Sequence, residues 1–169
     1  MKHPLQEGLR LTPQRIFLRV DYEVPAGEGA RALRQAFDRN HDGALDPGEQ
    51  HDLAEHLART ATLRTRVAVD GVDAPLVRDA VRPEKVDLPA GSDALLAVRV
   101  ELSAAWPSGK GDWRGRRKLV LTDEDPSGHV PVSASCENCQ ISDSNSGLWA
   151  KGPPEKLLGA HTPLELTIR

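Results

Sequence analysis

The spacing of apolar residues changes twice along the chain, and this change limits the folds that the chain can adopt. Within residues 9–24 (LRLTPQRIFLRVDYEV), apolar and polar side chains alternate from Ile16 to Val24. This alternation predicts a strand with one buried face. From residue 28 to 60 the apolar residues recur at helical spacing, and beyond residue 62 short alternating segments return. The pattern therefore predicts a mixed α+β fold.

Residues 28–60 are predicted to form a helix, a loop and a second helix. The apolar residues at helical spacing are Ala30, Leu33, Phe37, Leu53 and Leu57. The second helix has a clear start signal, because Asp46 suits the N-cap position and Pro47 the first helical position. Glu49 follows three residues after the cap, as in a capping box.

The rest of the chain is typical of an all-β domain. Asp70–Gly71 lies between apolar runs and predicts a hairpin turn. Further strands are expected in ALLAVRVELSAAW, RKLVLTD, HVPVSAS and PLELTIR, separated by many of the chain's 13 prolines and 14 glycines. We expect residues 1–169 to form a single β-rich, β-sandwich-like domain into which residues 28–60 are inserted.

The stretch between the two predicted helices matches a calcium-binding pattern. Residues 38–49 (DRNHDGALDPGE) fit D-x-[DN]-x-[DN]-G-x₅-E, the signature of an EF-hand loop. The predicted metal ligands are Asp38, Asn40, Asp42, the backbone carbonyl of Ala44, Asp46 and Glu49. The competing interpretation is an acidic, well-capped turn that binds no metal.

The chemistry of a hard cation explains this spacing. Ca²⁺ takes six to eight oxygen ligands, so a short chain must wrap around it. Gly43 permits the sharp bend, and Glu49 is expected to close the site with both carboxylate oxygens. Leu45 is expected to pack inward, whereas Arg39 and His41 are expected to face solvent.

The chain contains one such loop and a single methionine. EF-hands usually pair through a short strand at the position of Leu45, so an unpaired hand needs another partner there. A calcium sensor also exposes a Met-rich groove. We therefore expect a structural or extracellular-type site rather than a cytosolic sensor.

The two cysteines, Cys136 and Cys139, form a C-x-x-C motif in a Ser- and Asn-rich context. Three interpretations stay open: a local disulfide or inert thiols, a metal site, and a redox dithiol. A disulfide would favour an exported location. No nucleophile–base motif is present, so we expect no enzyme and assign no catalytic residue.

Charge and hydropathy limit the classes of partner and the cellular locations that we expect. The net charge of −3 argues against nucleic acid as a partner. No apolar run is long enough to cross a bilayer, and the first residues lack the apolar core of a signal peptide. We expect either a periplasmic or extracellular domain whose targeting segment has been removed, or a cytoplasmic protein.

Several segments resemble a group of bacterial membrane proteins. They are HPL at the start, IFLRVDYEV, FDRNHDGALDPGEQ, VAVDG and RKLVLTDED. Their order is similar to that in the extracytoplasmic N-terminal domains of bacterial membrane proteins of the nickel/cobalt transporter (hydrogenase/urease-accessory) type. The resemblance implies a soluble, outward-facing β-domain with an EF-hand-like insertion and a membrane-protein partner.

Together these observations predict an exported module in which one EF-hand binds Ca²⁺ and braces a β-domain for contact with a protein or membrane-protein partner. The alternatives are a calcium-dependent regulatory switch and a thiol-redox protein that uses the C-x-x-C motif.

Overall fold

The computed structural model describes residues 6–107, 117–123, 129–137, 141–143, 155–159 and 164–168. These residues form two helices and two β-sheets, a mixed α+β fold that is mostly strand. The helices are α1 (Glu28–Phe37) and α2 (Pro47–Arg64). The strands are β1 (Gln6–Leu11), β2 (Arg15–Val24), β3 (Thr65–Val69), β4 (Val72–Asp73), β5 (Val77–Glu84), β6 (Leu96–Ala105), β7 (Arg117–Asp123), β8 (His129–Cys136), β9 (Ile141–Asp143), β10 (Glu155–Gly159) and β11 (Leu164–Ile168).

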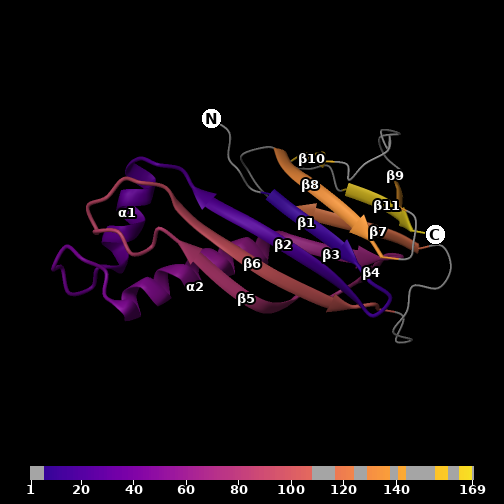
Figure 1. The fold of residues 1–169 in the computed structure, drawn as a ribbon, viewed down its shortest axis with the longest axis horizontal. Coiled ribbons are helices and arrows are strands. Elements are labelled where there is room, and N and C mark those ends of the chain that lie inside the picture. The colour runs from indigo at the N-terminus through magenta and orange to yellow at the C-terminus, as the bar shows by residue number, and fades with distance from the viewer. Residues whose placement is uncertain are drawn as a thin grey trace.

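The larger sheet has the strand order β10-β8-β1-β2-β6-β5, and the smaller has the order β4-β3-β7-β11-β9. β1 and β8 run parallel, whereas the other paired strands run antiparallel. Both helices lie at one end of the molecule, between β2 and β3 in the chain (Figure 1). No helix among the described residues is long and apolar enough to cross a membrane.

The predicted alternation is confirmed in the two central strands. In β2, Ile16, Leu18 and Val20 are buried, and β6 buries Val98 and Leu102 in the same way. The alternating region 9–24 contains two strands rather than one. A turn after Leu11 separates β1 from β2, where the Thr12 hydroxyl donates to the Arg15 carbonyl and accepts from the Arg15 N–H.

Both predicted helices are present, and the second extends to Arg64. Leu53, Leu57 and Ala61 of α2 are buried against the larger sheet. Helix α2 ends at Arg64 and β3 begins at Thr65, so no loop separates them. The helix and the smaller sheet therefore form one continuous layer.

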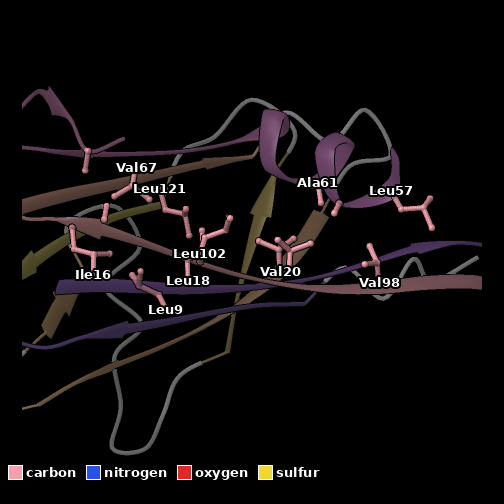
Figure 2. Packing of buried hydrophobic residues seen from close by; sticks show 14 of the residues in the cluster. Leu9, Ile16, Leu18, Val20, Leu57, Ala61, Val67, Val98, Leu102 and Leu121 are labelled. Atoms are coloured by element: carbon pink, nitrogen blue, oxygen red, sulfur yellow. The ribbon is translucent and has the colours of Figure 1, made fainter. Parts of the chain in front are cut away.

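One hydrophobic cluster includes residues of both sheets and both helices. Figure 2 shows that Leu57 and Ala61 of α2 lie over Val20 and Val98 of the larger sheet. Further along the same strands, Val67 and Leu121 of the smaller sheet face the side chains of Leu18 and Leu102 (Figure 2). The inner face of the larger sheet is thus covered by α2 at one end and by the smaller sheet at the other.

The sequence predicted some of the remaining strands and missed others. Asp70 and Gly71 both have positive φ, 51° and 79°, so the predicted hairpin turn is present between β3 and β4. Strands β6, β7, β8 and β11 lie in segments where strands were expected. β5, β9 and β10 were not predicted. β5 is mostly exposed, contains Pro83 and lies at a sheet edge, so it lacks a buried alternating pattern.

The shared core gives a direct test of packing. Leu102 is 1% exposed, whereas Leu63 on α2 is 67% exposed. Leu102→Ala is expected to lower the free energy of unfolding by about 2–5 kcal/mol, because it leaves a cavity between the layers. Leu63→Ala, the same chemical change at the surface, is expected to alter it by less than about 0.5 kcal/mol. Urea unfolding of both variants measures the difference, and equal losses would contradict this packing.

Candidate functional site

The acidic loop joins α1 to α2 at the tip of the helical end (Figure 1). Gly43 has φ 84°, in the left-handed region, so the glycine at the predicted bend is required by the backbone. His41 also has positive φ, 57°. The chain therefore turns sharply twice within a few residues.

Asp38, the first predicted ligand, is the most unusual carboxylate of the loop. Its side chain is only 6% exposed. Oδ2 accepts a hydrogen bond of 3.0 Å from the N–H of Gly43, so the carboxylate points across the loop. Oδ1 is buried and has no hydrogen-bond partner. A buried carboxylate oxygen without a partner is costly, and a cation would satisfy it.

The middle of the loop is exposed and held by short-range hydrogen bonds. Asn40 Oδ1 accepts from the N–H of Asp42, and Asn40 Nδ2 donates to Asp42 Oδ2, both at 3.0 Å. Asp42 Oδ1 accepts from the N–H of Ala44 at 2.8 Å. These bonds give the two side chains defined orientations.

Asp46 and Glu49 form the predicted capping box. Asp46 Oδ1 accepts from the N–H groups of Gly48 and Glu49, at 2.7 and 2.9 Å. Glu49 is 5% exposed, and its Oε2 accepts from the N–H of Asp46 at 3.0 Å. Glu49 Oε1 accepts from the N–H of Arg39 at 2.8 Å. The last residue of the predicted loop is thereby joined to its second residue, which closes the loop on itself.

The residues between the predicted ligands also lie as expected. Leu45 is 6% exposed and belongs to the shared core, so its inward packing is confirmed. Arg39 and His41 are exposed, and Arg39 pairs with Asp52 on α2. Gln50 Nε2 donates to the carbonyl of Leu45 at 2.7 Å, which adds a further tie between loop and helix.

The carboxylates of the loop do not converge in this conformation. Across the described part of the chain, no three His, Cys, Asp or Glu side chains are grouped so as to hold a metal ion. The physical reason is that Asp46 and Glu49 are turned toward backbone N–H groups of the loop and of the first turn of α2. The donor chemistry still fits a hard cation. All the side-chain donors are oxygen, and Asp38 keeps one buried oxygen free.

Sequence reasoning missed Arg34, which is fully buried on α1. Its Nη1 donates to the carbonyls of Ser92 and Ala94, and its Nη2 to those of Lys85 and Leu95, at 2.5 to 3.1 Å. All four carbonyls belong to residues 85–95, which we call the β5–β6 connection. One guanidinium thereby anchors an irregular segment to the helix that leads into the loop.

The electrostatics of Arg34 reflect this burial. Desolvation lowers the pKa of the guanidinium, and the negative charges of Asp87 and Asp93 oppose that shift. A signal for Arg34 was present in the sequence. It lies four residues after Ala30 and three before Phe37, and so on the apolar face of α1. A cation near the C-terminal end of a helix is also favourable at the surface, so this position alone does not indicate burial.

Cys136 ends β8 and is disulfide-bonded. The other cysteine of the chain, Cys139, lies outside the described residues, so the pairing of the two remains a prediction. Cys136 is the last residue of a strand, whereas a redox C-x-x-C motif usually begins a helix.

The comparisons with known proteins provide no relative from which function can be transferred. A search against known protein families gives no match to this chain, and a search of curated proteins gives no significant similarity. Function is therefore inferred from the residues of the chain themselves.

The role of Arg34 is tested by its removal. Arg34→Met is expected to lower the free energy of unfolding by about 3 kcal/mol or more, because four partly buried hydrogen bonds to backbone carbonyls are lost together. Arg31→Met is the matched control on the same helix. Among the described residues, the side chain of Arg31 forms an exposed pair with Asp93, at 3.4 Å, so its loss should cost less than about 1 kcal/mol. Denaturant unfolding compares the two, and similar losses would contradict the anchoring role.

Proposed function

We propose that this chain is a calcium-binding module in which residues 38–49 act as a single EF-hand inserted in a β-sandwich-like domain. The observation that carries the proposal is the buried Asp38 Oδ1, which has no hydrogen-bond partner inside a loop of oxygen donors. Ca²⁺ prefers oxygen ligands and would supply the positive charge that this oxygen lacks.

The residues that would hold the ion are those predicted from the sequence. They are Asp38, Asn40, Asp42, the carbonyl of Ala44, Asp46 and Glu49. Binding would require Glu49 to exchange its backbone hydrogen bonds, wholly or in part, for the cation. The bond from Gly43 to Asp38 and that from Ala44 to Asp42 hold two of these carboxylates in place, which lowers the entropy cost of binding.

The ion would brace the helical end of the molecule. Leu45 packs into the core that both sheets share, so a bound cation would stabilise the loop and the core next to it together. We propose a binding role rather than catalysis, because the capped, hydrogen-bonded loop suits a static metal site. A protein or membrane-protein partner on the outer side of a membrane agrees with the family resemblance described above.

The disulfide at Cys136 supports an exported location. Disulfides persist in oxidising compartments and are rare in the cytosol. We therefore propose the periplasmic or extracellular side as the site of action. The position of Cys136 at the end of a strand supports a structural disulfide over a redox function.

Calcium titration tests the proposal. If the loop binds Ca²⁺, the free energy of unfolding should rise by about 2.7 kcal/mol at a hundredfold excess of calcium over Kd. Calorimetry gives Kd, and thermal unfolding with and without calcium gives the stabilisation. A melting temperature that does not respond to millimolar calcium would refute the proposal.

Glu49→Gln should weaken calcium binding at least about tenfold, because the site loses a negative charge and a ligand oxygen. Glu55→Gln on the same helix is the matched control. Glu55 pairs with Arg78 at 2.7 Å, outside the loop, so its substitution should leave calcium binding unchanged. The calcium-induced change in melting temperature is compared, because Glu49 also caps backbone groups in the metal-free protein.

A further inference from the structure

The β5–β6 connection is hydrogen-bonded to the acidic loop at Gly43, which lies between two of the predicted ligands. The N–H of Ala90 donates to the carbonyl of Gly43, at 3.0 Å. Ala90 is 3% exposed, whereas Gly43 is exposed, so the donor of this bond is protected from solvent but the acceptor residue is not. A backbone carbonyl of the loop is thus hydrogen-bonded to a residue 47 positions away in the same chain.

This bond acts on a predicted ligand through a single peptide unit. The carbonyl of Gly43 and the N–H of Ala44 belong to the same planar peptide and point in opposite directions. The carbonyl accepts from Ala90, and the N–H donates to Asp42 Oδ1 at 2.8 Å. The orientation of the Asp42 carboxylate therefore depends on a donor in the β5–β6 connection.

The same connection is fixed to the helix that leads into the loop. The guanidinium of Arg34 holds four of its carbonyls, and the N–H of Gly27 donates to the Asp93 carbonyl at 2.8 Å. Lys85, whose carbonyl is one of the four, has φ 58°, a conformation that costs free energy for a residue with a side chain. The contacts with α1 maintain this strained backbone.

We propose that the β5–β6 connection is a structural partner of the calcium loop, bonded to it at Gly43, two residues before the position through which EF-hands usually pair, and that Ala90 is a positioning residue for Asp42. This inference rests on the proposed calcium site. Calcium binding and the ordering of residues 85–95 then form one linked equilibrium. By thermodynamic reciprocity, a change that displaces the connection weakens calcium binding, and bound calcium opposes that displacement by the same factor.

Amide hydrogen exchange on the unmodified protein is the first test. Calcium should slow exchange of the Ala90 amide, and of the Gly27 amide that bonds to Asp93, at least about tenfold, because opening of the connection would disturb the metal site. The Asp70 amide is the internal control, since it donates to the Lys118 carbonyl in a hairpin turn that contacts no part of the loop in the described structure. Unchanged exchange at Ala90 in a protein that binds calcium would overturn the inference.

Substitution at the donor is the second test. Ala90→Pro removes the N–H that bonds to Gly43, and it should weaken calcium binding about three- to tenfold, as expected for the loss of one hydrogen bond from a buried donor. Gly91→Ala is the matched control in the same connection, because an added Cβ there would meet no atom within 4 Å. It should leave Kd unchanged within about twofold.

The outcomes separate this inference from the proposed function. Equal calcium affinity in folded Ala90→Pro and Gly91→Ala would overturn the inference and leave the calcium site intact. Absence of calcium binding in the unmodified protein would overturn both. If circular dichroism shows that Ala90→Pro does not fold, the exchange measurement on the unmodified protein decides.

Discussion

The burial of one positive charge organises the helical end of this molecule. Arg34 is excluded from solvent and retains its charge, so its N–H groups need acceptors from the protein. The β5–β6 connection supplies them with four backbone carbonyls, and those carbonyls in turn gain donors that the irregular segment lacks. The two terminal nitrogens of Arg34 thus gain acceptors and the connection gains donors, although the Nε of Arg34 is buried without a hydrogen-bond partner. The connection can therefore lie against the acidic loop without regular secondary structure.

The helical hairpin is part of the same core as the sheets, although the sequence pattern presents it as an insertion. Leu53, Leu57 and Ala58 belong to the cluster that also contains Leu18 and Leu102. Because α2 continues directly into β3, the helix has no independent hinge at its C-terminal end. For the proposed calcium site, this geometry favours a brace that stabilises a fixed arrangement over a switch that swings a helix through a large angle.

Features that depend on neighbouring residues could be predicted from the sequence. The alternation in β2 and β6, the Asp46 cap, the bend at Gly43 and the inward packing of Leu45 each follow from local chemistry. The bonds of Arg34 and Ala90 could not be predicted, because they join residues some 50 positions apart by backbone groups that carry no sequence signature. The sequence pattern also could not predict how the loop carboxylates are oriented, since Asp46 and Glu49 can serve either as cation ligands or as helix-capping groups.

The parallel pairing of β1 with β8 has a consequence for how the chain folds. Leu9 in β1 lies opposite Ala134 in β8, and β1 is bonded on its other side to β2. During synthesis the first strand is made long before its second neighbour, so one edge of β1 stays open while the intervening residues emerge. Closing so long a loop costs conformational entropy, and the contacts that offset this cost form only when β8 pairs with β1. The β1–β2 hairpin, β6 and the helical end can associate earlier, whereas β8 and then β10 join the larger sheet only after residues 129–136 and 155–159 become available.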